Sequence, residues 1–349
     1  MIEPFLEELE NRLDPQTEEA LEAEWNRFLD RRFDGGIFRP RRRAAALARL
    51  EWPSILINHA LRAPELLLLR ELRSVSDTLA AGSGNLLNIR CNYGTSILPS
   101  LFGVEPFYLD DDCDTLPTSM PLADGRDGIR RLVDAGVPPL DRGLAPKVFG
   151  TAAFFRARLE PYPKLREYVR LYHPDLQGTA DVAEVVWGSG IFMEFYDDPA
   201  LIRAFFELIT AAYREFMDRW ECEFPPLPDR FRCHWGWGHR GKIVLRDDSA
   251  MNLSPDMYAE FVLPFDRALL ERYGGGVVHF CGRGDHYIDL LAGVPELTGI
   301  QLSQPECNDM EKIYRHTVDR GIPLFGLPLE TAEQALACGR PLHGLVHCC

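Results

Sequence analysis

Residues 242–303 read KIVLRDDSAMNLSPDMYAEFVLPFDRALLERYGGGVVHFCGRGDHYIDLLAGVPELTGIQLS. Short apolar runs, KIVL, VVHF and GIQL, alternate here with longer segments in which apolar residues recur at helical spacing. Ser254 and Pro255 are typical of a helix N-terminus, and the glycines at 274–276 end the helix that they begin. The stretch therefore predicts strands that alternate with helices.

The same alternation continues to the end of the chain, where IPLFGLP (322–328) and HGLVHCC (343–349) predict two more strands. Five strands in series with helices between them indicate parallel pairing with right-handed crossovers. Such a series fits either a doubly wound sheet or the second half of a (β/α)₈ barrel. A doubly wound nucleotide-binding sheet would need a glycine-rich loop after its first strand, but the glycines at 274–276 precede a strand.

Polar residues fall at the C-terminal end of almost every predicted strand. They are Asp247 and Asp248, His279 and Cys281, Gln301 and Ser303, and His347 and Cys348. In a barrel these ends converge on one mouth, where active sites lie. We therefore predict an α/β fold with a (β/α)₈ barrel over residues 81–349. Residues 1–80 are mostly helical in pattern and are expected to form an N-terminal extension that packs on the barrel.

Composition restricts the classes of function. The 349 residues carry a formal charge of −15, which disfavours nucleic acid and anionic membrane surfaces as partners. The basic run RPRRR at 39–43 is most simply a solvated loop, with anion binding as the alternative. No segment reaches the roughly 18 apolar residues of a membrane span, and nine scattered cysteines do not suggest a disulfide framework. A soluble cytoplasmic protein is expected.

His279 and Cys281 are candidate metal ligands. Residues two apart on a strand share a face, so both side chains point the same way. A third ligand from the last strand, Cys348, would complete a three-ligand site with an open position, as catalytic zinc requires. His343, His347 and Cys349 are alternatives for that third position. The same spacing is also compatible with a buried cysteine beside a core histidine.

Further candidates come from other strand ends. Asp247 or Asp248 could act as a general base or an additional ligand. NIRCNYGTSILPSLF (88–102) contributes Arg90 and Tyr93, and HPDLQG (173–178) contributes Asp175 and Gln177, one strand period apart. Arg90 could pair with Asp175 or with a ligand carboxylate. An aromatic cluster could line a planar ligand or form a packed loop; its members are His234, Trp235, Trp237 and His239.

DDSAMNLSPDMYAEFVLPF followed by GGGVVHFCG resembles the uroporphyrinogen decarboxylase superfamily, most strongly over 243–305 and more weakly from 86 to the C-terminus. That superfamily contains decarboxylases and zinc-dependent methylcobamide:thiol methyltransferases, both on (β/α)₈ barrels. Two departures favour the methyltransferase branch. The arginine-rich RQAGR-type segment of the decarboxylases is missing, and the position of their acidic SDI-like segment is occupied by Asn88, Arg90 and Tyr93.

The resemblance implies zinc bound by His-x-Cys and a distant cysteine, here His279, Cys281 and Cys348. The expected activity is transfer of a methyl group between a corrinoid and a thiol-type acceptor. Asp247, Arg90 and Tyr93 would then be catalytic, and substrate would be bound by Asp175, Gln177, Gln301 and Trp235. The corrinoid is expected on a partner protein, because no D-x-H-x-x-G-like motif is present. The alternatives are a metal-free decarboxylase of a tetrapyrrole or other acid, and a non-catalytic corrinoid- or tetrapyrrole-binding protein.

Overall fold

A computed structural model describes residues 2–226 and 231–348. Its central feature is a six-stranded parallel sheet in the order β1-β12-β11-β10-β9-β8. The strands are β1 (Ile37–Phe38), β8 (Ile243–Arg246), β9 (Gly276–Phe280), β10 (Leu297–Leu302), β11 (Leu324–Leu327) and β12 (Val346–Cys348). The five strands expected from residue 242 onward are therefore present and parallel. β1 was not expected, because it lies within the segment that reads as helical.

The crossovers between these strands are helical, as the sequence predicts. They contain α11 (Pro255–Met257), a π-helical turn (Tyr258–Val262), α12 (Leu263–Arg272), α13 (Ile288–Leu291), α14 (Met310–His316) and α15 (Leu329–Ala337). The side chain of Ser254 accepts a hydrogen bond from the N–H of Met257, and Pro255 occupies the first turn. This is the helix start that the sequence indicates.

A second parallel pair joins β2 (Asn88–Ile89) to β5 (Arg170–Leu171). The backbone N–H of Gly178, in the segment after β5, donates to the carbonyl of Arg246 at the end of β8. The remaining strands form two antiparallel hairpins, β3 (Pro106–Phe107) with β4 (Thr118–Ser119), and β6 (Arg232–His234) with β7 (Trp237–His239). The pairing thus gives a mixed α/β fold built on two parallel sheets.

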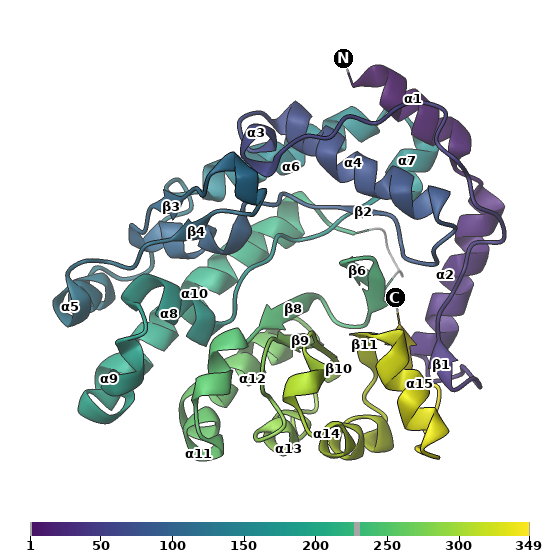
Figure 1. Ribbon diagram of the computed structural model, residues 1–349. Coiled ribbons are helices and arrows are strands. Elements are labelled where there is room, and N and C mark those ends of the chain that lie inside the picture. Colours follow the sequence, from purple (N-terminus) through teal and green to yellow (C-terminus); the bar gives the residue numbers. More distant parts are fainter. Residues whose placement is uncertain (1, 227–230, 349) are drawn as a thin grey trace.

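Helices surround the strands in Figure 1, with α2, α4, α10, α12, α14 and α15 around β2, β6 and β8 to β11. Those not yet given are α1 (Glu3–Arg12), α2 (Pro15–Leu29), α3 (Ile57–Ala60), α4 (Pro64–Ala80), α5 (Gly125–Ala135), α6 (Ala145–Leu159), α7 (Pro163–Tyr168), α8 (Thr179–Trp187), α9 (Ile191–Asp197) and α10 (Pro199–Glu223). The long helix expected over 199–223 is α10. Within the described ranges, no helix is long and apolar enough to cross a membrane.

The two faces of the six-stranded sheet pack differently. On β8 and β9, Leu245 and Val278 belong to the large core shared with the helices. Val244 and Val277 face a smaller aromatic core, which includes Trp25 of α2 and residues of the β6–β7 hairpin. Because successive side chains on a strand alternate between faces, this division decides which polar residues meet beyond the strand ends.

Candidate functional site

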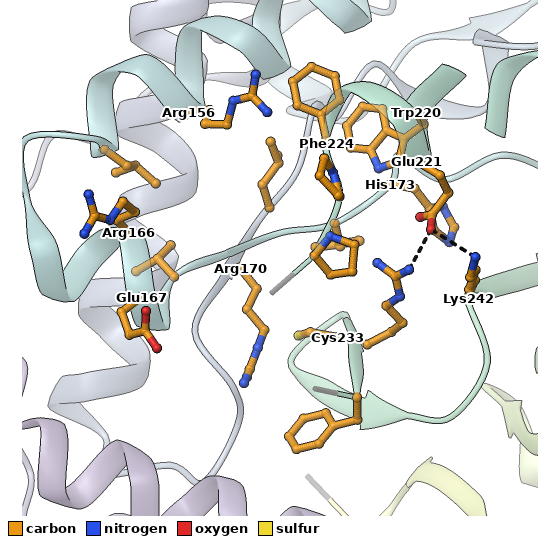
Figure 2. Close-up of a pocket in the computed structure, with 18 of the residues that line it drawn as sticks. Arg156, Arg166, Glu167, Arg170, His173, Trp220, Glu221, Phe224, Cys233 and Lys242 are labelled. Atoms are coloured by element: carbon orange, nitrogen blue, oxygen red, sulfur yellow. Dashed lines mark hydrogen bonds and ion pairs between the residues drawn. The ribbon is translucent and has the colours of Figure 1, made fainter. Parts of the chain in front are cut away.

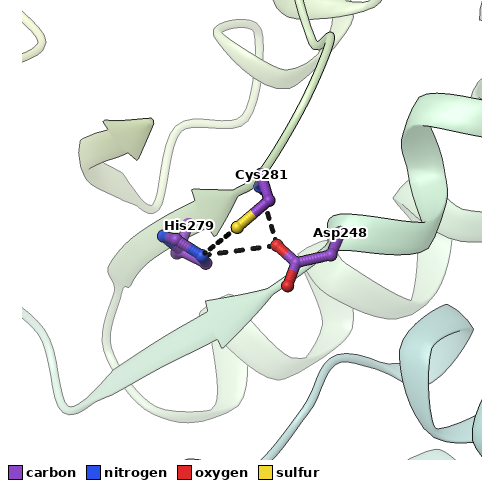
Figure 3. A group of neighbouring side chains, drawn as sticks. All are labelled: Asp248, His279 and Cys281. Carbon is purple, nitrogen blue, oxygen red and sulfur yellow. Dashed lines mark hydrogen bonds and ion pairs between the residues drawn. The ribbon is translucent and has the colours of Figure 1, made fainter. Parts of the chain in front are cut away.

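Asp248, His279 and Cys281 lie together at the C-terminal ends of β8 and β9 (Figure 3). The Nε2 of His279 is 3.4 Å from the Sγ of Cys281 and 3.3 Å from the Oδ1 of Asp248. One potential ligand atom from each of the three residues lies within 4.8 Å of the other two. His279 is buried, whereas Asp248 and Cys281 are partly exposed. The group is therefore partly accessible to solvent through Asp248 and Cys281.

Strand alternation explains why these three residues meet. β8 and β9 are paired with Arg246 opposite His279. Arg246 and Asp248 continue the face of Val244, and His279 and Cys281 continue the face of Val277. The backbone N–H of Cys281 donates to Oδ1 of Asp248 at 2.7 Å, which holds the two segments together.

Gln301, near the end of β10, and Ser303, just after it, support the group. Nδ1 of His279 is hydrogen-bonded to Oε1 of Gln301. Since an amide oxygen only accepts, Nδ1 carries a proton, and Nε2 is the nitrogen that faces Cys281 and Asp248. The hydroxyl of Ser303 donates to Sγ of Cys281 at 3.0 Å. Gln301, expected to bind substrate, thus lies in contact with His279.

The electrostatics of the group favour charge on both His279 and Asp248. Burial lowers the pKa of His279, but hydrogen bonds to Asp248 and Cys281 and the charge of Asp248 outweigh it and raise the pKa to about 9. Burial alone would raise the pKa of Asp248, but His279 and Arg246 hold it below its usual value. A metal ion bound by Nε2 of His279, Sγ of Cys281 and the carboxylate of Asp248 can take the place of the proton on Nε2.

Asp247, the carboxylate expected to act as base or ligand, lies on the opposite face. It is fully buried beside the carboxyl group of Asp266 on α12. Burial and then the neighbouring acid raise the pKa of Asp247 well above its usual value. Strand alternation is the reason. Asp247 lies on the same face as Leu245, which packs against the helices, so the next residue, Asp248, lies beside His279 and Cys281.

The structure does not bring Cys348 into the group. Cys348 is buried on the helix-facing side of β12, with Val346, and three strands separate β12 from β8. His347 faces the aromatic core, where its ring lies 4.8 Å from that of Trp25. His343 is on an exposed loop beside Asp319. Cys349 lies outside the described residues.

Arg90 and Asp175 form an ion pair, one of the two arrangements expected for them. Asp175 also contacts Arg246, with 3.0 Å between Oδ2 and Nη1, and His234, with 3.1 Å between Oδ1 and Nε2. Burial alone would raise the pKa of Asp175, but Arg90, His234 and Arg246 hold it far below its usual range. Arg246 Nη2 lies 3.9 Å from Oδ2 of Asp248, so this network reaches the group.

Two other expected site residues have different surroundings. Tyr93 is buried toward the helices, where its hydroxyl is 2.7 Å from the Oγ1 of Thr151 on α6. Tyr93 lies beyond β2, which ends at Ile89, so the two-residue period of a strand does not relate it to Arg90. Gln177 is buried, and its Nε2 has no hydrogen-bond partner among the residues that the structure describes.

Trp235 reaches the group from the tip of the β6–β7 hairpin. Its φ is +47° and that of Gly236 is +87°, the left-handed conformations of a type I′ turn. A bulky residue rarely adopts such a φ. The indole lies 5.2 Å from the ring of His279, and the guanidinium of Arg246 lies 5.3 Å from the indole centroid. The aromatic cluster therefore forms a packed hairpin, and the indole of Trp235 at its tip contacts His279 and Arg246.

Two cavities flank this hairpin. One, of about 350 Å³, lies between α4, β2 and the hairpin tip and has Arg90 and Trp235 in its wall. The other, of about 230 Å³, is drawn in Figure 2 and lies among α6, α7, the end of α10 and the starts of β5 and β6. There Glu221 pairs with Arg232 and Lys242 (Figure 2). Of the expected site residues, only His239 of the aromatic cluster is among the described residues that line the second cavity.

No family model matches the chain, and no curated protein sequence matches it. Among solved structures, a methyltransferase from Methanosarcina mazei is similar, with a TM-score of 0.58 and 17% sequence identity. The similarity covers 83% of this chain and 80% of that chain. The two chains therefore share a fold over most of their lengths.

Three residues of the site were not singled out from sequence: Arg246, His234 as a partner of Asp175, and Asp248 in preference to Asp247. A signal for two of them was present. Counting in twos from Val244 places Arg246 and Asp248 on one face, as counting from Val277 does for His279 and Cys281. The contact between His234 and Asp175 joins segments 59 residues apart and has no counterpart in local spacing.

Proposed function

We propose that the protein is a zinc-dependent methyltransferase that moves a methyl group between a corrinoid carrier and a thiol-type acceptor. The observation that carries this proposal is the convergence of Asp248, His279 and Cys281. The sequence resemblance and the fold shared with a methyltransferase support the reaction class.

The donor set fits zinc. Nitrogen, sulfur and carboxylate oxygen are its usual ligands, and donors about 2.0–2.3 Å from a tetrahedral ion lie about 3.3–3.7 Å from one another. The separations from Nε2 of His279, 3.4 Å to sulfur and 3.3 Å to oxygen, agree with this. We assign Asp248 as the third ligand, with Cys348 as the rival assignment.

We further propose that the two parallel sheets belong to one (β/α)₈ barrel, with β1, β2, β5 and β8 to β12 as its strands. These strands occur in this order along the chain, and the last of them pairs with the first. The hydrogen bond from Gly178 to Arg246 links the β5 segment to β8. Asp248, His279 and Cys281 would then lie at the C-terminal mouth, where barrel enzymes place their active sites.

The chain's own residues would prepare the site for a thiol. Gln301 fixes the tautomer of His279, and Ser303 donates a hydrogen bond that stabilises the thiolate of Cys281. Three protein ligands leave one position open, and bound zinc would lower the pKa of an acceptor thiol. The acceptor sulfur would give its electron pair to the methyl carbon. The bond from methyl to its donor would break with its electron pair left on the donor, and the thiol proton would leave to solvent.

The corrinoid is proposed to come on a partner protein, since the sequence carries no corrinoid motif of its own. A direct test is whether a purified methylcorrinoid protein loses its methyl group to a thiol only when this chain is present. The corrinoid absorbance spectrum reports that loss.

Metal analysis of protein purified without chelator tests the zinc assignment. We expect one zinc per chain, loss of zinc in Cys281→Ser, and retention in Cys348→Ser, which removes the same sulfur from the opposite face of the sheet. Loss of zinc in Cys348→Ser would instead support Cys348 as the third ligand. Full methyl transfer by metal-free protein would rule out the zinc mechanism, and decarboxylation of a tetrapyrrole acid by that protein would favour the decarboxylase alternative.

A further inference from the structure

The cavity between α4, β2 and the hairpin tip has a polar wall that includes charges of both signs. Its charged residues are Arg70, Glu71 and Arg90, and its amides are Asn85, Asn88 and Asn92. At about 350 Å³ it lies within the range of small-molecule sites. Most ligand sites are lined mainly by apolar groups, so this wall suits a ligand that is itself charged and hydrogen-bonding.

This cavity adjoins the proposed zinc site. Trp235 is part of its wall, and the same indole lies 5.2 Å from the ring of His279. Arg90, also in the wall, pairs with Asp175, which in turn holds Arg246 beside Asp248. A molecule in the cavity would therefore lie next to the residues that position the zinc ligands.

Glu71 and Arg90 each retain binding capacity. Oε2 of Glu71 accepts one hydrogen bond, from the backbone N–H of Arg90 at 3.0 Å, whereas two carboxylate oxygens offer about four lone-pair sites. Burial raises the pKa of Glu71, and the charge of the nearby Arg90 opposes that rise. Arg90 uses Nη1 for Asp175, and its guanidinium has five N–H donors in total.

We propose that this cavity binds the ammonium and carboxylate groups of a thiol-bearing α-amino acid, the acceptor of the methyl group. Glu71 takes the ammonium, Arg90 takes the carboxylate, and the thiol side chain extends past Trp235 toward the zinc ligands. The inference rests on the proposed function for the fate of the thiol. The recognition of the zwitterion depends only on this cavity.

The test uses L-methionine, which carries both charged groups but no thiol, so binding does not depend on zinc. Isothermal titration of the full chain as purified, repeated after chelation, should give the same affinity. We expect 4-(methylthio)butanoate, which lacks the ammonium, and 3-(methylthio)propylamine, which lacks the carboxylate, to bind at least about tenfold more weakly.

Glu71→Gln keeps an oxygen for the N–H of Arg90 and removes the charge. This variant should bind L-methionine about tenfold more weakly or worse. Its affinity for 4-(methylthio)butanoate should be unchanged, because that ligand has no ammonium group to contact Glu71. Asp77→Asn, on an exposed position of the same helix, is the matched control and should change neither affinity.

Equal affinities for the three ligands, or no binding of L-methionine at millimolar concentration by folded protein, would overturn the proposal. A protein that binds L-methionine but contains no zinc would retain this inference and disprove the zinc mechanism.

Discussion

The two ring nitrogens of His279 have different partners, and this leaves Nε2 as the nitrogen that a metal ion would bind. Gln301 occupies Nδ1, while Nε2 lies near the sulfur of Cys281 and the carboxylate of Asp248. Contacts of this kind, made to the second nitrogen of a ligand histidine, fix ring orientation and raise ligand basicity.

Gln301→Leu should lower zinc affinity by about 10–100-fold, because the His279 ring loses the acceptor that fixes its tautomer. Gln301→Glu keeps an acceptor and should restore most of the affinity. Competition with a chromophoric zinc chelator measures both variants. An unchanged affinity in Gln301→Leu would show that Gln301 does not position His279.

The adjacent carboxylates should behave differently. Asp248→Asn removes a proposed ligand and should weaken zinc binding by at least about tenfold. Asp247→Asn should keep zinc and change the free energy of unfolding by less than about 1 kcal/mol, since burial raises the pKa of Asp247 and the neutral amide avoids the cost of a buried charge. Loss of zinc in Asp247→Asn together with retention in Asp248→Asn would instead identify Asp247 as the ligand.

At the scale of elements, the β6–β7 hairpin carries the site's most strained residue. Trp235 occupies a left-handed turn position that glycine or asparagine would adopt more readily. Backbone strain of this kind costs on the order of 1–3 kcal/mol and is concentrated at functional sites. The conformation directs the indole toward His279 and Arg246.

Replacing Trp235 by glycine and by alanine separates the backbone from the ring, because both variants lack the indole. Trp235→Gly should be more stable than Trp235→Ala by about 1 kcal/mol, the reverse of the usual order in helices. Urea unfolding of the two variants tests this. An alanine variant as stable as the glycine variant would mean that the turn is not strained.

For the whole molecule, four of the five buried histidines, all except His279, have lowered pKa values that link stability to pH. Burial lowers the pKa of His173 to about 4 and of His239 and His347 to about 3, and it lowers that of His234 well below 6.5. In the unfolded chain each would titrate near 6.5. As pH falls below that value, the unfolded chain takes up protons that the folded chain does not, so stability is lost.

Each of these four histidines should contribute a fall in the free energy of unfolding of up to about 1.4 kcal/mol per pH unit between about pH 6.5 and 4. Buried acids such as Asp266, whose pKa is raised to about 7, contribute in the opposite direction. His347→Gln keeps a carbonyl acceptor for the N–H of Gly326 and should reduce the slope by one histidine's share. Urea midpoints at pH 7, 6 and 5 measure the slope. An unchanged slope in this variant would show that His347 does not contribute.

Local sequence was sufficient to predict most strands and helices of the C-terminal half. The strands after residue 242 and the helix that begins at Ser254 follow from short-range spacing and capping. The pairing of His279 with Cys281 follows from the two-residue period of a strand. β1 was not predictable in this way, because two residues with no alternation acquire strand structure only by pairing with β12.

By itself, the sequence determined that β-α units carry polar residues at their strand ends, since periodicity and capping are local properties. Tertiary structure alone decided which of those residues meet. Asp248 rather than Asp247 or Cys348 joins His279 and Cys281, because the register of neighbouring strands and the face of each side chain set the contacts. The contacts of Trp235 and of Arg90 with Asp175 likewise depend on segments that are distant in the chain. Contacts of that range leave no trace in local periodicity.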